Sequence, residues 1–215
     1  MEVSILPVTP FQQNCSLLVC ERTRKGAIVD PGGEVERLVA HAEERCDEVE
    51  KILLTHAHLD HAGGTAELAR RLDVPIEGPH TEDQFWIDLL PEQAMQFGFP
   101  EAETFTPDRW FEDGDTVTVG ETELAIRHCP GHTPGHQVLF LDLIETGPLV
   151  LSGDLYHFQL SREKRRVPTF NVDEEMTLDS MDRVEAFVTE VGATFWIEHN
   201  LELFQGLATA PAYYN

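Results

Sequence analysis

The sequence predicts an α/β (α+β) fold in which two β-sheets are covered on their outer faces by helices. Segments typical of strands alternate with helical patterns in both halves of the 215-residue chain, as such a layered arrangement requires. Metal-binding residue types follow several of these strands between residues 56 and 199, so dividing the chain would divide one site. Because no linker, low-complexity tract or fixed-period repeat interrupts the pattern, we expect a single domain spanning residues 1–215.

The first half is predicted to open with a β-hairpin, since two alternating segments flank a polar loop at residues 9–14. The strands expected in this half are residues 2–8, 15–20, 27–30, 51–54 and 74–77. Apolar residues Val35, Leu38, Val39 and Ala42 recur at helical spacing and indicate an amphipathic helix. The helices expected here are residues 34–45, 65–72 and 81–90, the last followed by an irregular stretch rich in Pro, Phe and Gly.

The second half is predicted to build the second sheet and one long helix. Its expected strands are residues 116–119, 123–127, 137–141, 149–151 and 194–197. The helix is expected over residues 173–191, with its apolar side chains facing inward: Met176, Met181, Val184, Phe187 and Val188.

Composition argues against large polyanionic partners. Thirty-nine acidic residues against fifteen basic ones give a formal charge of −24, whereas nucleic acid and anionic membranes require basic surface. No secretory signal and no apolar run of about 20 residues is visible. The four cysteines lack a paired framework, which is typical of reduced thiols in a cytoplasmic protein. We expect a cytoplasmic monomer or homodimer that acts on a small molecule.

The most informative motif is the run His-x-His-x-Asp-His at residues 56–61, which follows a buried strand. On an extended segment His56 and His58 point the same way, because side chains alternate with period two. They can therefore share one metal ion, while Asp60 and His61 fall where the chain turns and face a second position. Imidazole nitrogen and carboxylate oxygen suit zinc, and also iron or manganese.

Further metal-binding residue types follow three later strands. His132 lies in a turn punctuated by Gly and Pro over residues 129–136, where a stiff backbone favours coordination. Asp154 follows an apolar run at residues 148–151, and His199 follows another at 195–197. Four strand ends that carry such residues favour a site for two metals over a site for one.

These residues resemble the ligand set of the metallo-β-lactamase superfamily, and the resemblance covers nearly the whole chain. It implies a four-layer αββα metallo-β-lactamase sandwich with the metals at one edge. It also implies two divalent ions, with zinc favoured over iron or manganese. The first ion would be held by His56, His58 and His132, the second by Asp60, His61 and His199, and Asp154 would bridge them.

The closer resemblance changes along the chain. Residues 3–135 resemble the single-domain glyoxalase II-like hydrolases of bacteria, through the segments 7–15, 29–33 and 106–110. Residues 154–215 resemble the N-acyl-homoserine lactonase-like branch, through the segments 155–158, 165–168 and 210–214. A mosaic, natural or built by recombination, is the simplest interpretation.

The predicted chemistry is hydrolysis of an acyl bond by a hydroxide held between two metals. We favour opening of a lactone or ester, with N-acyl-homoserine lactones as the substrate class, because the segment after Asp154 is lactonase-like. The alternative is glyoxalase II-type hydrolysis of hydroxyacylglutathione thioesters, which the longer N-terminal segment supports. Nothing in the sequence selects for a β-lactam, and a structural or redox role for the metals is a further alternative.

The two acyl substrates differ in their leaving groups. A thiolate leaves without help, because the pKa of its parent thiol is near ~8.5, whereas an alkoxide needs a metal or a hydrogen-bond donor. Tyr156 and His157, just after Asp154, are the candidate donors; the lactonases resembled here use a tyrosine three positions on, where this chain has His157. Asp60 could also shuttle a proton, but we favour a plain ligand role.

Two further clusters bear on the substrate. Arg162, Lys164, Arg165 and Arg166 could meet an anionic group, although pairing with the protein's own acids is favoured. Aromatic residues could line a groove for an acyl chain, and the region of Trp86 is the preferred candidate among Phe11, Phe85, Trp86, Phe97 and Phe99.

Overall fold

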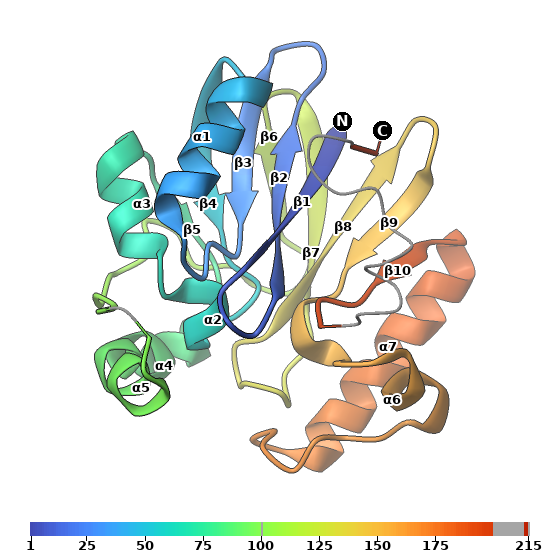
Figure 1. The fold of residues 1–215 in the computed structure, drawn as a ribbon. Helices are drawn as coiled ribbons and strands as arrows, with labels where there is room; N and C mark the ends of the chain where they lie inside the picture. Colours follow the sequence, from blue (N-terminus) through green and yellow to red (C-terminus); the bar gives the residue numbers. More distant parts are fainter. Residues whose placement is uncertain (100, 200–212, 215) are drawn as a thin grey trace.

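The computed structural model describes residues 1–99, 101–199, 213 and 214. Two five-stranded sheets pack against each other, and helices cover the two outer faces (Figure 1). Helices α1 (Val35–Arg45) and α3 (Thr65–Leu72) lie over the first sheet, and α7 (Glu174–Val191) lies over the second. The predicted α/β sandwich is therefore confirmed.

The first sheet has the strand order β1-β2-β3-β4-β5. Its strands are β1 (Glu2–Val8), β2 (Gln13–Val19), β3 (Lys25–Val29), β4 (Glu48–Leu53) and β5 (Ile76–Glu77). The first three pair antiparallel, as the predicted hairpin requires. The β3–β4 and β4–β5 pairs are parallel, and their crossover connections contain α1 and α3, because parallel neighbours cannot be joined by a tight turn.

The second sheet has the strand order β10-β9-β8-β7-β6. Its strands are β6 (Thr116–Val119), β7 (Thr122–His128), β8 (Gln137–Leu143), β9 (Gly147–Leu151) and β10 (Thr194–Trp196). Strands β6 to β9 form an antiparallel meander, whereas β10 pairs parallel to β9 after the crossover through α7. All these strands were predicted, with ends that differ by one or two residues.

The remaining helices lie between the strands and their loops. They are α2 (Leu59–Ala62), the 3₁₀ turn η1 (Thr81–Asp83), α4 (Gln84–Asp88), α5 (Leu90–Phe97), the 3₁₀ turn η2 (Gly153–Leu155) and α6 (Gln159–Lys164). Two expectations are wrong here. The helix predicted over residues 81–90 is divided into η1 and α4, and α5 occupies part of the stretch expected to be irregular. The expectation of irregular structure rests in part on Pro91. Proline is compatible with the first turn of a helix, because the N–H groups there have no partner within the helix.

The buried face of α7 also differs from the prediction at its first turn and, to a lesser degree, at Phe187. Met181, Val184 and Val188 are buried, but Met176 is 44% exposed and Phe187 is only partly buried. The buried positions in the first turns are held by Thr177 and Ser180 instead, whose hydroxyls donate to the backbone oxygens of Asp173 and Pro130. Small polar side chains can face inward when their hydroxyls are bonded, which a purely apolar pattern does not reveal.

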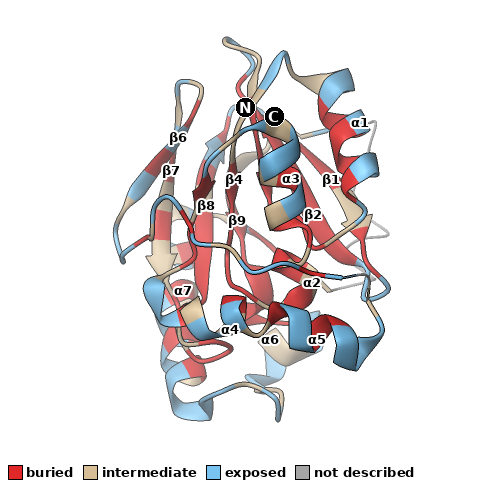
Figure 2. Ribbon diagram, turned by 90° about the vertical axis from the view of Figure 1, so that its left-hand side faces the viewer, coloured by how far each residue is buried: buried red, intermediate tan, exposed pale blue. Residues whose placement is uncertain are grey.

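Three apolar cores separate the four layers. Much of the strand backbone between the helices belongs to buried residues (Figure 2). Adjacent residues of β2 show the arrangement, since side chains alternate across a strand. Leu17 belongs to the core under α1 and α3, whereas Leu18 belongs to the core between the two sheets. Val150 of β9 packs with Met181 in the third core, beneath α7. Within the described residues, none of the helices has the length and apolar character needed to cross a membrane.

Candidate metal centre

The metal-binding residue types singled out in the sequence are delivered to one place by loops from both sheets. At the first sheet, His56 and His58 lie in the loop after β4, and Asp60 and His61 lie in helix α2. At the second sheet, His132 lies in the β7–β8 loop, Asp154 in turn η2 and His199 in the segment after β10. Because β9 and β10 are parallel, their carboxyl ends lie at the same edge of the sheet. The potential ligand atoms form two groups there.

The first group contains His56, His58, His132 and Asp154, whose potential ligand atoms all lie within 4.8 Å of one another. His132 Nε2 lies 2.9 Å from His58 Nδ1 and 3.3 Å from Asp154 Oδ2. His56 Nε2 lies 3.9 Å from the same carboxylate oxygen. His56 and His132 therefore converge on one oxygen of Asp154, and His58 lies beside His132.

The second group contains Asp60, His61 and His199. His199 Nε2 and His61 Nε2 lie 3.4 Å and 3.8 Å from Asp60 Oδ2. Both imidazoles also lie 3.4 Å from Asp154 Oδ1, the carboxylate oxygen that faces away from the first group. Asp154 thus stands between the two groups, with one oxygen toward each.

The residues present fit a pair of metal ions. His56 Nε2, His61 Nε2 and Asp154 Oδ1 are buried and have no hydrogen-bond partner within the described part of the chain. Buried polar atoms without partners are costly, and a cation bound to imidazole nitrogens and carboxylate oxygens would satisfy them. Nitrogen and oxygen donors suit zinc or iron, so the donor set alone does not select between these metals.

The pKa values of His56 and His199, one from each group, shift in opposite directions. Burial lowers the pKa of His56 well below its usual value, and neighbouring histidines add to this effect. Burial acts the same way on His199, but the carboxylates of Asp154 and Asp60 outweigh it and raise its pKa to about 10. Burial opposes ionisation of Asp154, yet the surrounding histidines hold its pKa well below the usual range. The metal-free centre therefore retains protons on the Asp60 side, which a metal must displace.

Asp30 supports the second group from behind. Its Oδ2 lies 2.9 Å from His61 Nδ1, so that His61 Nε2 is directed toward the metal-facing side. The same carboxylate accepts hydrogen bonds from the backbone N–H and the hydroxyl of Thr55 at 2.7 Å and 2.6 Å. Asp30 has a left-handed backbone conformation with φ of 53°, which aspartate tolerates better than most residues.

Asp83 joins the two loops that carry the first group. Its carboxylate accepts hydrogen bonds from Ala57 N, Thr133 Oγ1 and Gly135 N at 2.9, 2.9 and 2.6 Å. These donors flank His56, His58 and His132 in the sequence. Burial raises the pKa of Asp83 to about 6, although the three donors favour the ionised form. Sequence patterns gave no signal for this residue, because its partners lie more than twenty positions away.

His136 positions Asp154. Its Nδ1 donates to Cys129 O and its Nε2 accepts the backbone N–H of Asp154 at 3.0 Å. A Cβ atom at Gly153 would lie 2.7 Å from His136 Nε2, so this contact requires glycine. His136 belongs to the motif at residues 129–136, but the sequence gave no indication of this role, because Asp154 lies 18 positions further along the chain.

The two candidate proton donors point in different directions. His157 Nε2 lies 3.2 Å from Asp154 Oδ2. The hydroxyl of Tyr156 instead donates to Glu185 Oε1 of α7 at 3.0 Å, and its ring packs against Phe195 beneath the loop. The structure therefore brings His157 to the centre and directs Tyr156 away from it, since consecutive residues of an extended segment face opposite sides.

A cavity of about 680 Å³ opens onto the two groups. Its lining includes His58, Asp60, His132, Asp154, His157 and His199, so it reaches both sides of the centre. Aromatic side chains form much of the remaining wall: Phe11, Trp86, Phe97, Phe158 and Phe170. Of the aromatic residues expected to line a groove, Phe11, Trp86 and Phe97 do so, whereas Phe85 and Phe99 are not among its lining residues.

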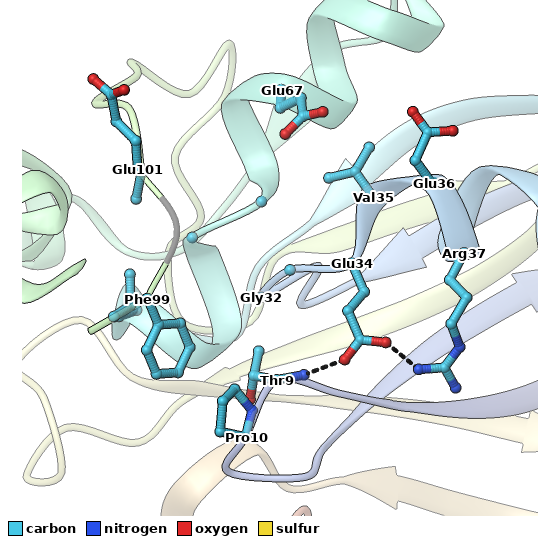
Figure 3. A pocket seen from close by; sticks show the side chains of 15 residues that line it. Thr9, Pro10, Gly32, Glu34, Val35, Glu36, Arg37, Glu67, Phe99 and Glu101 are labelled. Atoms are coloured by element: carbon cyan, nitrogen blue, oxygen red, sulfur yellow. Dashed lines mark hydrogen bonds and ion pairs between the residues drawn. The ribbon is translucent and has the colours of Figure 1, made fainter. Parts of the chain in front are cut away.

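A second cavity of about 630 Å³ lies beside the starts of α1 and α3 and shares Leu59 with the first (Figure 3). The one cation in its lining, Arg37, is bonded to Glu34, which also accepts the backbone N–H of Thr9. Three further acids, Glu36, Glu67 and Glu101, line this cavity. It contains none of the residues of the two metal-binding groups.

The chain belongs to the metallo-beta-lactamase superfamily, whose family model matches residues 8–191. The hydroxyacylglutathione hydrolase GloC of Haemophilus influenzae is 46% identical over 137 residues, or 63% of this chain. That match spans 64% of the relative's own length. An N-acyl homoserine lactonase of a Bacillus species is 29% identical over 170 residues, which cover 75% of this chain and 60% of the relative. Both branches recognised in the sequence are thus among its relatives.

Solved structures agree with this placement. A protein crystallised in a di-iron-bound form is 27% identical, with a TM-score of 0.72 over 91% of each chain. A quorum-quenching N-acyl homoserine lactone lactonase has the same fold, with a TM-score of 0.73 and 21% identity over 99% of this chain and 97% of its own. The chain is therefore a member of a metallo-hydrolase superfamily.

Proposed function

We propose that this protein hydrolyses acyl thioesters at a dinuclear metal centre, in the manner of glyoxalase II. The observation that carries the proposal is the position of Asp154 between two groups of ligand-type side chains at the inner end of a cavity. The 46% identity to a hydroxyacylglutathione hydrolase supports the thioester over the lactone that the sequence favoured. Thioester hydrolysis, the alternative in the sequence analysis, therefore becomes the first candidate, and lactone opening becomes the second.

In this proposal one metal ion would be held by His56, His58 and His132 and the other by Asp60, His61 and His199, with Asp154 available to both. The two ions would lower the pKa of a water molecule toward neutrality and polarise the acyl carbonyl. Zinc and iron both suit these donors, and a structural relative is known in a di-iron form.

The chain's own residues orient the substrate and manage protons. Asp30, Asp83 and His136 fix the ligand-carrying loops, so that little reorganisation is needed during reaction. Trp86 packs edge-on against His58 with ring centroids 4.6 Å apart and so helps to hold that imidazole in place. A thiolate leaving group, with a parent pKa near ~8.5, needs no proton donor, so the thioester reaction places no demand on His157.

Lactone opening is the second candidate, and the position of His157 favours it. An alkoxide leaving group needs a donor, and His157 Nε2 lies 3.2 Å from Asp154 Oδ2 at the wall of the cavity. The 29% identity to an N-acyl homoserine lactonase is consistent with this activity.

The test compares kcat/KM of the metal-loaded protein for three substrates: S-lactoylglutathione, the S-lactoyl thioester of N-acetylcysteamine, and N-hexanoyl-homoserine lactone. We expect at least one thioester to exceed the lactone by about tenfold or more. Asp154→Asn should lose hydrolysis of all three, whereas Asp142→Asn, an exposed aspartate on β8, should retain it. Faster turnover of the lactone than of both thioesters would replace the proposal with the second candidate.

A further inference from the structure

Apart from the histidines of the metal centre itself, the cavity over that centre has no basic side chain in its lining. None of its lining residues is lysine or arginine. All fifteen lysines and arginines of the chain fall within the described residues, because the segment 200–212 and positions 100 and 215 contain none. No cation is therefore supplied by the part of the chain that the structure leaves undescribed.

The outer part of this cavity is aromatic. Phe11, Phe97, Phe158 and Phe170 are 46%, 53%, 57% and 62% exposed, whereas the histidines of the first group are buried or nearly so. Half-exposed phenylalanines gathered around one opening are unusual on a protein surface and mark a binding site for apolar groups. Phe11 contacts Phe97 edge-on, and Phe170 contacts His157 in the same manner, with centroids 5.9 Å and 5.0 Å apart.

Two of the four basic residues that follow Asp154 in the sequence are paired with acids of α7. Arg162 makes a bidentate pair with Glu185, through Nε at 2.6 Å and Nη2 at 2.8 Å, and Arg165 Nη2 lies 2.9 Å from Asp182. Both arginines line a separate cavity of about 250 Å³ that also contains Tyr156. Lys164 and Arg166 are exposed and line neither cavity.

The neighbouring cavity offers no alternative anchor for an anion. Its single cation, Arg37, is bonded to Glu34 and to the backbone oxygen of Pro7. Three further acidic residues line the same cavity (Figure 3). An anionic group held away from the metals in either cavity would lose hydration without gaining an unpaired lysine or arginine as partner, in a chain whose formal charge is −24.

We infer that this centre, if it is the thioesterase proposed above, selects uncharged apolar thioesters and disfavours glutathione thioesters. Glutathione carries two carboxylates and one ammonium group, so its net charge is negative, and recognition of carboxylates in proteins relies on arginine or lysine. The aromatic wall would instead hold an alkyl or aryl group on the thiol or acyl side of the substrate. The specificity thus departs from that named for the Haemophilus relative.

Binding of inert analogues tests this inference without turnover. Calorimetry on the metal-loaded protein would compare S-hexylglutathione with the S-hexyl thioether of N-acetylcysteamine, which carries the same alkyl group without charge. We expect the neutral thioether to bind about tenfold more tightly, with a ratio that shrinks as salt screens the repulsion. Equal or tighter binding of the glutathione analogue, or binding of neither, would overturn the inference.

Turnover separates this inference from the proposed function. Hydrolysis of the S-lactoyl thioester of N-acetylcysteamine with a kcat/KM about tenfold above that of S-lactoylglutathione supports both. A preference for S-lactoylglutathione overturns the inference and leaves the thioesterase standing. If that preference disappears in Lys164→Ser/Arg166→Ser, these exposed cations supply the missing anchor. Hydrolysis of neither thioester overturns the proposed function and the inference with it.

A charge introduced at the opening provides the converse test. Gln96 lines the cavity and is exposed on α5, so Gln96→Lys should fold and place a cation beside the aromatic wall. We expect it to shift the ratio of the two affinities severalfold toward the glutathione analogue. Thr118→Lys, an exposed position on β6 outside the cavity, makes the same change in net charge and should leave the ratio unaltered. Equal shifts in both variants would show that the local charge is not what discriminates.

Discussion

Asp30 Oδ2 lies 2.9 Å from His61 Nδ1, although the two residues are separated by more than thirty positions. Asp30 directly follows β3 and His61 lies in α2, so the contact couples the carboxyl end of a central strand of the first sheet to the candidate metal centre. The pKa of His61 is raised well above its usual value, because the carboxylates of Asp154, Asp60 and Asp30 outweigh the effect of its burial. The orientation of His61 therefore depends on a residue outside the proposed ligand set.

Replacing Asp30 with alanine should weaken metal binding more than it weakens the fold. Loss of a carboxylate behind a ligating histidine typically reduces metal affinity by about 10- to 100-fold. Competition with a chromophoric chelator would measure this change for Asp30→Ala. Asp142→Ala removes one charge from an exposed position of β8 and serves as the control. An Asp30→Ala affinity within twofold of the parent would show that His61 needs no such support.

Replacing Asp83 should reduce stability, because three donors would lose their buried acceptor. Each unsatisfied buried donor costs about 1–3 kcal/mol, so we expect Asp83→Ala to lower the free energy of unfolding by about 3 kcal/mol or more. Denaturant unfolding of the metal-free protein measures it. Asp88→Ala removes an exposed carboxylate that accepts one surface hydrogen bond from Gln84 and should cost well under 1 kcal/mol. Similar losses in the two variants would contradict the role given to Asp83.

His157 and Tyr156 should differ in their effects on catalysis. We expect His157→Phe to lower kcat/KM for a lactone about 100-fold, but for a thioester less than tenfold, because only the alkoxide needs a proton. Tyr156→Phe should leave both rates nearly unchanged and cost about 1 kcal/mol of stability through its lost bond to Glu185. Measured metal content would confirm that the variants retain their ions. A large rate loss in Tyr156→Phe alone would reverse the assignment.

His41 should contribute a pH dependence of stability that is independent of the metals. It lies in α1, its Nε2 is 2.8 Å from Ser4 Oγ, and burial together with nearby Arg45 lowers its pKa. As the pH falls through about 6.5, His41 therefore becomes protonated in the unfolded chain while it stays neutral in the folded protein. Stability is retained above that pH and falls as the pH drops below it. Unfolding free energies between pH 7 and 5 should fall more steeply for the parent than for His41→Gln; parallel profiles would contradict this.

Much of the fold could be predicted because its signals are local. Residues 2–8, 65–72 and 116–119 alternate or repeat at strand or helix spacing, and the observed elements have the same bounds. The αββα layering follows from the same patterns, since each strand and helix must bury its apolar face. Helices α2 and α6 contain only a few residues and no full apolar period, so the sequence pattern did not indicate them.

The candidate site could be predicted in part. His56, His58, Asp60 and His61 stand together in one motif, and His132, Asp154 and His199 each follow a strand. Supporting residues such as Asp30 and Asp83 could not be found this way, because their partners are distant in the sequence and adjacent only after folding. The direction of Tyr156 likewise depends on Glu185, which belongs to a helix that follows it by many residues. The segment at residues 210–212 that contributed to the lactonase resemblance lies outside the described residues.

The central claim is that two metal ions share Asp154, and metal stoichiometry tests it most directly. The purified protein would be stripped with a chelator, reloaded with zinc or iron, and measured for metal per chain and for thioester hydrolysis. We predict two ions per chain, activity only in the reloaded protein, and a loss of both bound metal and activity in Asp154→Ala. Full activity in the stripped protein, or two firmly bound ions in Asp154→Ala, would contradict the account.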